Sequence, residues 1–249
     1  MYTSDIDRQL FSKIDDGIEL CCIRQKPYFI FFMSERKQYI AQQYLKSVGF
    51  DNYTFFGGYE NSERKMLGLF FNDKDIKCFP IYAIEFSFRN CDKLNHRDFL
   101  GALMSLGIER DTIGDILIED GRCIVFVREE LKDYITSQVF KIGNVGVKVN
   151  IADLSKLPQG RGMIENNYVV SSLRLDNIVA AVCKISREKT RSMILSGNVC
   201  VNYSEVKNVS FNLKPDDIFT IRGKGKFILS GILGNTGKGR LRISVIYFR

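Results

Sequence analysis

A boundary in charge near residue 170 divides this chain into two regions of different character. From Ser171 to Arg249 the chain carries fourteen Lys and Arg residues against five Asp and Glu residues, a net charge of +9. The preceding residues carry twenty-two against twenty-four, a net charge of −2, and together the two regions give the formal charge of +7. This confinement of positive charge predicts a C-terminal domain whose field attracts polyanions, above all nucleic acid.

The composition indicates a folded chain with room for several small domains. Its 249 residues are 45% hydrophobic and include only four prolines, so we expect little flexible linker. The first twenty residues contain five acidic side chains and do not resemble a secretion signal. The longest apolar run, Tyr28–Met33, is too short to span a bilayer. We therefore expect a cytoplasmic protein with no membrane segment.

Cysteine and histidine usage argues against a metal or cofactor site. The seven cysteines are odd in number and include no Cys-x-x-Cys pair, which favours reduced, partly buried thiols. The one histidine, His96, lies at a predicted helix start. A single histidine removes most His-based metal sites and argues against a hydrolytic triad. We expect no metal and no cofactor.

We expect an α+β protein of three small domains, at 1–79, 80–160 and 171–249, and the last of these carries the excess positive charge. The order of predicted helices and strands in each segment supports this division.

The first segment combines two helices with two β-prone runs. Apolar residues at helical spacing predict a helix over Asp5–Ile23. A second helix is expected between Ser34, a candidate N-cap, and Gly49, a C-terminal stop. Tyr53–Phe56 and Met66–Phe71 follow as β-prone runs around a glycine turn. The segment therefore predicts a small α/β domain.

The second segment has the order β-α-β-β-α-β. We expect strands over Ile81–Phe88, Ile113–Ile118, Cys123–Val127 and Gly146–Ile151, and helices over Arg97–Ser105 and Glu130–Phe140. This order is the ferredoxin-like arrangement, which many RNA-recognition domains share with unrelated proteins. The order alone therefore assigns no function.

Aromatic residues on the predicted central strands test whether this sheet binds RNA. RNA-recognition motifs stack bases on exposed aromatic side chains of the two central strands. The first strand offers Tyr82, Phe86 and Phe88, whereas the third offers only Phe126. Because Tyr82, Ile84 and Phe86 share one face of their strand, we expect them to pack against the helices.

The third segment predicts two short helices joined at a tight corner. Asp176 is the expected N-cap of a helix over 177–184, and Ser186 is the expected N-cap of a helix over 187–196 that Gly197 ends. The N–H groups at both helix starts favour phosphate. Strands are expected near 198–202, 217–222, 226–233 and 240–248.

Cations in this segment are the candidate RNA contacts. Arg187 and Arg191 are four residues apart and share a helical face. Arg222-Gly223-Lys224-Gly225-Lys226 alternates charge with glycine, which lets the backbone approach a phosphate closely. We predict a platform that reads structured RNA by shape, formed by Arg174, Lys184, Arg187, Lys189, Arg191, Lys207, Arg222, Lys224, Lys226, Lys238 and Arg240.

The spacing of these residues resembles the RNA-binding domain named for small-subunit ribosomal protein four, the S-four domain. The resemblance rests on Arg174-Leu175-Asp176, Ser186-Arg187, Ile194, Gly197, Val199, Val201-Asn202, Asp217-Ile218 and Arg222-Gly223-Lys224-Gly225. Tyr203 replaces the glycine that usually follows the Val-Asn pair. The resemblance implies an RNA-binding domain.

Taken together, the three segments are similar to the YlmH-like proteins of bacteria. The added residues are Phe55-Phe56-Gly57-Gly58-Tyr59-Glu60, Glu63-Arg64-Lys65 and the stretch Gly234–Arg240. This resemblance covers nearly the whole chain. It implies a ribosomal RNA-binding protein associated with the large subunit and peptidyl-tRNA during rescue of stalled translation.

Some enzymes also carry an S-four domain, so an enzymatic function is the alternative. Arg174-Leu175-Asp176 looks similar to a pseudouridine synthase motif, but a helix cap explains it here. Gly57-Gly58 lacks the third glycine of a methyltransferase loop, and Gly231–Gly239 lacks the spacing of a nucleotide-binding loop. We expect a non-catalytic RNA-binding protein. An RNA-modifying enzyme with an unrecognised N-terminal site and a protein-interaction module with incidental basicity stay open.

Overall fold

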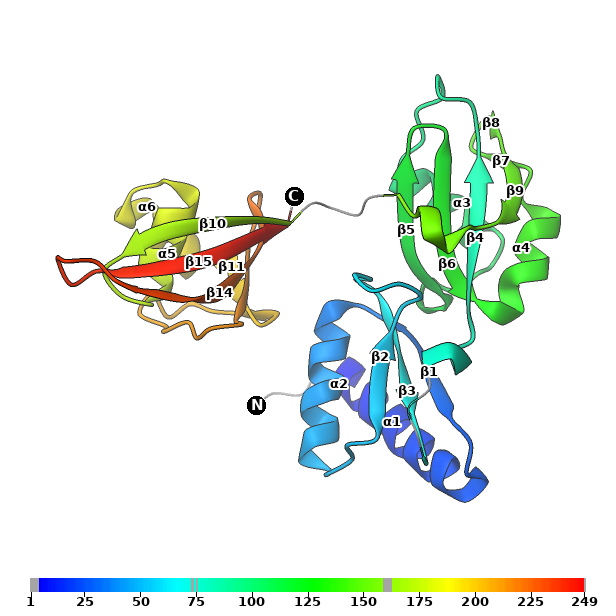
Figure 1. The fold of residues 1–249 in the computed structure, drawn as a ribbon, viewed down its shortest axis with the longest axis horizontal. Coiled ribbons are helices and arrows are strands. Elements are labelled where there is room, and N and C mark those ends of the chain that lie inside the picture. The colour runs from blue at the N-terminus through cyan, green and yellow to red at the C-terminus, as the bar shows by residue number, and fades with distance from the viewer. Residues whose placement is uncertain (1–4, 73, 75, 159–162, 249) are drawn as a thin grey trace. The chain divides into compact units, whose positions relative to one another are not determined.

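The computed structural model describes residues 5–72, 74, 76–158 and 163–248. The chain divides into two compact units, Met1–Gly160 and Arg161–Arg249. The first unit contains two small folds, each built around its own sheet, and the second contains a single six-stranded sheet with two helices (Figure 1). The α+β class and the C-terminal position of the basic domain agree with the sequence analysis.

The first fold of unit one places two helices against a three-stranded antiparallel sheet. Its elements are α1 (Asp5–Arg24), β1 (Tyr28–Met33), α2 (Glu35–Ser47), β2 (Tyr53–Phe56) and β3 (Lys65–Leu69). The strand order is β1-β3-β2. Side chains of both helices and of β3, including Ile14, Leu45, Leu67 and Leu69, form one buried cluster. The apolar run Tyr28–Met33 is therefore a strand of this sheet, which the sequence analysis did not assign.

The second fold has the predicted ferredoxin-like order. Its elements are β4 (Ile81–Ser87), α3 (His96–Ser105), β5 (Ile113–Glu119), β6 (Arg122–Arg128), α4 (Lys132–Gln138), β7 (Lys141–Ile142), β8 (Val145–Gly146) and β9 (Lys148–Ile151). The sheet order β5-β6-β4-β9 places the first and third strands of the motif at the centre. Ile84 and Phe86 pack with Phe99 and Leu103 of α3, as their shared strand face predicts.

A third apolar cluster joins these two folds. It contains Phe32 and Met66 from the first sheet together with Ala83, Ile124 and Phe126 from the ferredoxin-like sheet. Strands β3 and β6 are therefore buried on both faces, which explains why their sequences are continuously apolar and do not alternate. The first 160 residues form one compact unit because the two sheets share this core.

The second unit is a six-stranded antiparallel sheet that carries two helices. Its elements are β10 (Met163–Val170), α5 (Leu175–Cys183), α6 (Arg187–Leu195), β11 (Val199–Val201), β12 (Ser204–Glu205), β13 (Ile218–Ile221), β14 (Gly225–Asn235) and β15 (Leu241–Phe248), in the sheet order β10-β15-β14-β13-β11-β12. Leu175, Ile178, Val179 and Ile194 pack the helices onto one face of the sheet. Strand β10 belongs to this sheet, so the basic unit includes residues before the predicted start at 171.

Candidate nucleic-acid interface

Local sequence signals shape the corner between α5 and α6. The Ser186 hydroxyl accepts a hydrogen bond from the backbone N–H of Lys189, which confirms the predicted N-cap of α6. Gly197 ends that helix at φ +73°, a conformation that favours glycine. Lys184 ends α5 in the left-handed region at φ +53°. Only Ile185 then separates it from the next cap, so the two helices are forced into a tight turn.

The predicted cap of α5 is wrong, and the error affects the site. Arg174 is the N-cap residue, because a bridge holds Arg174 to Asn212 and the next residue, Leu175, donates its N–H to the Phe211 carbonyl. Asp176 lies inside the first turn and accepts from the Asn177 N–H at 3.0 Å. Acceptors of the protein itself therefore occupy the N–H donors at the start of α5, so this helix end does not offer them to a phosphate, contrary to the sequence-based expectation.

Arg187 and Arg240 line one cleft on the helix side of the unit. The cleft has a volume of about 150 Å³ and is lined by Val169, Val170, Ser171, Asn177, Ala180, Arg187 and Arg240. We call it the arginine cleft. Arg187 donates from Nη2 to the Ser171 hydroxyl at 3.4 Å. Two guanidinium groups beside a hydroxyl form a set of donors that matches a phosphate. The Asn177 amide donates to the Ser172 hydroxyl at 2.7 Å.

Further predicted cations extend the positive surface along α6 and the β13–β14 turn. Lys189 and Arg191 are exposed on α6 together with Arg187. Lys224 lies near the C-terminal end of α5, because it lines a cleft together with Cys183. Burial raises the pKa of the Cys183 thiol, and the nearby positive charge of Lys224 acts against that increase. Lys184 and Arg222 are exposed at the end of α5 and in the β13–β14 turn, and Lys238 is exposed near the tip of the β14–β15 hairpin.

Three predicted contacts do not join this surface as free cations. Arg174 forms a 2.9 Å ion pair with Asp176, and this hydrogen-bonded carboxylate raises its pKa. Lys207 pairs with Glu205 at 3.1 Å and follows β12, at the sheet edge opposite β10. Lys226 lies over the Phe248 ring, on the sheet face away from the helices, because its neighbour Phe227 faces the core.

The sequence analysis missed the polar partners of the arginine cleft. Ser171 and Asn177 line it, yet neither carries a charge or belongs to a motif. Their position depends on β10, whose Val170 pairs with Leu241 and so brings the start of the unit beside Arg240. Strand pairing between residues far apart in the chain leaves no local signal at either residue.

The ferredoxin-like sheet does not present its central aromatic residue for base stacking. Phe126 is 1% exposed and stacks on Tyr59 at 5.0 Å between ring centroids. The Asp115 carboxylate accepts from the Tyr59 hydroxyl at 2.8 Å and from the Glu63 and Arg64 N–H groups at 2.6 and 2.9 Å. This network fixes the Phe55–Lys65 region across the sheet, so the face that RNA-recognition motifs use is covered.

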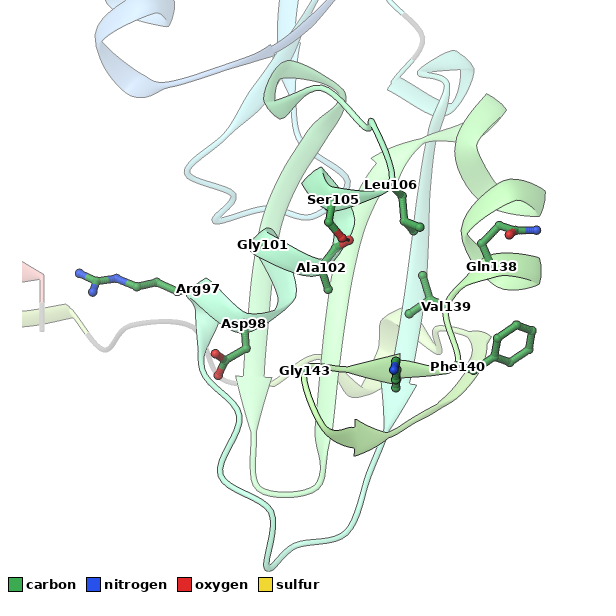
Figure 2. A pocket seen from close by; sticks show the side chains of 11 residues that line it. Arg97, Asp98, Gly101, Ala102, Ser105, Leu106, Gln138, Val139, Phe140 and Gly143 are labelled. Carbon is green, nitrogen blue, oxygen red and sulfur yellow. Dashed lines mark hydrogen bonds between the residues drawn. The ribbon is translucent and has the colours of Figure 1, made fainter.

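A groove of about 700 Å³ lies beside α3 in the same unit (Figure 2). Gly101, Ala102 and Ser105 line it from α3, and Arg97 and Phe140 point outward at opposite ends. The Asp98 carboxylate accepts from the Asn95 N–H and completes the cap of α3. Among the described residues that line the groove, no second carboxylate faces it, so it lacks the paired acids of acid–base catalysis.

Two negative observations concern the described residues alone. Over 5–72, 74, 76–158 and 163–248, no three His, Cys, Asp or Glu side chains come together as a possible metal site. In the same part of the chain, every helix is too short or too polar to cross a bilayer.

Comparison with known proteins identifies the family. Residues 75–156 match the family model described as "Putative RNA-binding domain in YlmH", and residues 173–219 match the S4 domain. The chain is 32% identical over 242 residues to the ribosome-associated protein quality control protein P2 of Bacillus subtilis (strain 168), covering 93% of this chain and 92% of that protein. The chain belongs to the YlmH-like family.

Two further likenesses of this YlmH-like protein are partial. It is 44% identical over 52 residues to small ribosomal subunit protein uS4 of Carsonella ruddii (strain PV), which covers 20% of this chain and 26% of that protein. The solved structure of cell division protein YlmH from Streptococcus pneumoniae has a TM-score of 0.55 at 19% identity, and covers 64% of this chain and 98% of that chain. The second likeness supports the fold alone.

Proposed function

We propose that this YlmH-like protein is a non-catalytic RNA-binding protein of the cytoplasm, which binds structured ribosomal RNA or tRNA through its C-terminal unit. We further propose that it acts on the large ribosomal subunit, beside peptidyl-tRNA, in the rescue of stalled translation. The name of the Bacillus subtilis relative supports a place in ribosome-associated quality control. The match to the S4 domain supports RNA as the ligand.

The observation that carries the proposal is the arginine cleft and the exposed helix face beside it. Arg187 takes part in both, because it lines the cleft at the start of α6 and is followed one turn later by Arg191. Cations spaced along one helix and across to a hairpin can contact successive phosphates of an RNA backbone. Such contacts recognise the shape of folded RNA and do not require a particular base.

Ribosome co-sedimentation of a charge-reversal variant tests the proposal. Arg187→Glu with Arg191→Glu leaves the fold intact, since both side chains are exposed, and is expected to abolish co-sedimentation at moderate salt. Arg89→Glu with Lys93→Glu is the matched control, because it reverses two exposed charges at the same spacing in the other unit. The control variant is expected to sediment with ribosomes as the wild type does.

Two results would contradict the proposal. Unchanged co-sedimentation of the Arg187→Glu, Arg191→Glu variant would show that the α6 face does not bind the ribosome. Robust modification of ribosomal RNA bases by the purified protein would end the non-catalytic assignment and favour an RNA-modifying enzyme.

A further inference from the structure

A second cleft lies on the helix side of the C-terminal unit, beyond the end of α5. It has a volume of about 230 Å³ and is lined by Asn166, Tyr168, Val182, Cys183, Lys224, Phe227 and Tyr247. We call it the tyrosine cleft. Every second residue of β10 faces the helix side: Val170 is buried, Tyr168 is half-buried and Asn166 is exposed. The exposure of these side chains rises from Val170 back to Asn166, because α5 ends and no longer covers this part of the strand.

A series of stacked rings runs from the core into this cleft. Phe219, which is 0% exposed, stacks on Phe227 with ring centroids 5.3 Å apart and an angle of 16°. Phe227 stacks on Tyr247 at 5.0 Å and 28°. Tyr247 is half-buried and lines the cleft. The series therefore ends at a ring that solvent reaches, where one more flat ring can continue it.

The β13–β14 turn brings a cation to the rim of the cleft. Gly225 has φ +117°, and a Cβ atom there would lie 2.8 Å from Cε2 of Tyr247. Only glycine lets the turn lie this close to the ring. The neighbouring Lys224 lines the cleft, and Asn166 adds an amide to its lining.

We propose that the tyrosine cleft binds one unpaired base of the RNA, which stacks on Tyr247 beside Tyr168 while Lys224 contacts its phosphate. The inference rests on the proposed RNA-binding function and adds to it, because backbone contacts alone do not distinguish paired from unpaired RNA. Aromatic side chains next to cations are the common means of holding unstacked bases. The volume is below the roughly 300–1,000 Å³ of pockets that enclose drug-sized ligands, so it suits a single base.

The two clefts lie along the same strand. Tyr168 lines the tyrosine cleft, and Val169 through Ser171 line the arginine cleft. At about 3.3 Å per residue the two sites are within about 10 Å of each other along the backbone. One RNA strand can therefore place a phosphate between Arg187 and Arg240 and an adjacent base against Tyr247. The net charge of +9 over Ser171–Arg249 favours RNA over a protein segment as the occupant.

Binding to two matched RNAs tests this inference on the full-length protein. The probes are a short RNA duplex with one bulged adenine and the same duplex without the bulge, each followed by fluorescence anisotropy. The wild type is expected to bind the bulged RNA about ten-fold more tightly, the size of a single stacking contact. Tyr247→Leu removes the ring on which the base is proposed to stack, so it is expected to lose this preference and keep its affinity for the paired RNA, whereas Tyr247→Phe retains the ring and the preference.

A second readout covers the case in which Tyr247→Leu is poorly folded, because Tyr247 also packs against the core. A fluorescent adenine analogue at the bulge is expected to be quenched on binding to the wild type, because it stacks on a tyrosine. Lys224 is exposed, so Lys224→Gln should not disturb folding. This variant is expected to weaken the quenching, because it removes the proposed contact with the phosphate. Equal binding of both RNAs by the wild type, without quenching, would overturn the base-binding cleft and leave RNA binding intact. Binding of neither RNA would overturn the proposed function itself and the inference with it.

Discussion

The two units use arginine in opposite ways. In the first unit, Arg64 donates from Nε to the Ile113 carbonyl at 2.9 Å and from Nη2 to the Phe32 carbonyl at 3.0 Å. Burial, with Arg110 nearby, lowers its pKa to about 10. In the second unit, Arg187 is exposed and has a long 3.4 Å bond to Ser171. An arginine that donates to backbone carbonyls of the same protein stabilises the fold. An arginine whose guanidinium group faces water is available to bind a ligand.

The largest expected effect is on the stability of the first unit. Asp115→Ala removes the acceptor of three hydrogen bonds, from the Tyr59 hydroxyl and from two backbone N–H groups. Because bonds to a charged group are strong and the donors would stay partly buried, we expect a loss of about 4 kcal/mol. Urea unfolding measures it. RNA affinity should be unchanged at temperatures where the variant is folded. A parallel loss of RNA affinity would show that the first unit also contributes to RNA binding.

The second effect in size is on RNA affinity and its dependence on salt. Arg187→Glu with Arg191→Glu should weaken RNA binding by at least about ten-fold and lower the slope of log K against log salt by about 2, one for each lost phosphate contact. Titrations at several salt concentrations measure both quantities. Its unfolding free energy should stay within about 0.5 kcal/mol of wild type, as expected for exposed sites. An unchanged slope would show that these arginines do not contact phosphates.

A smaller effect concerns Tyr59 at alkaline pH. Burial and the nearby Asp115 carboxylate raise the pKa of Tyr59 above its ordinary value of about 10. When pH rises past about 10, this tyrosine ionises in the unfolded chain before it ionises in the folded protein. The free energy of unfolding therefore falls as pH rises through this range. Tyr59→Phe should cost about 1 kcal/mol at neutral pH and flatten the alkaline decline. Unfolding free energies measured across this range test both effects, and an equally steep decline in the variant would contradict them.

The smallest predicted effect is a gain in stability that leaves RNA binding unchanged. Gly101 lies inside α3, and no atom comes within 4 Å of the position where its Cβ would be. Gly101→Ala should therefore stabilise the first unit by about 0.5–1 kcal/mol through helix propensity. Thermal unfolding would show it. A change in affinity for RNA would instead indicate that this helix contributes to binding.

Local signals in the sequence predicted local structure well. Ser186 and Gly197 marked the ends of α6 because a cap and a left-handed stop depend only on neighbouring residues. The cap of α5 was predicted wrongly at Asp176, because the helix start is set by contacts of Arg174 and Leu175 with residues near 211. Strand β1 was not assigned, because its apolar run does not alternate.

The site was predictable only in part for the same reason. Arg187 and Arg191 share a helix, so their spacing showed that they lie together. That Arg240 lies beside Arg187 depends on the pairing of β10 with β15, which no local pattern encodes. Lys226 was grouped with Lys224 on charge, yet the side-chain alternation of β14 directs it to the other face of the sheet.

Crosslinking of the ribosome-bound protein to RNA tests the central claim most directly. After ultraviolet irradiation, peptide mapping should place the crosslinked residues within 163–191 and 222–248, around the two clefts and the exposed face of α6. Crosslinks confined to the ferredoxin-like fold or to the groove beside α3, with none in the C-terminal unit, would contradict the account.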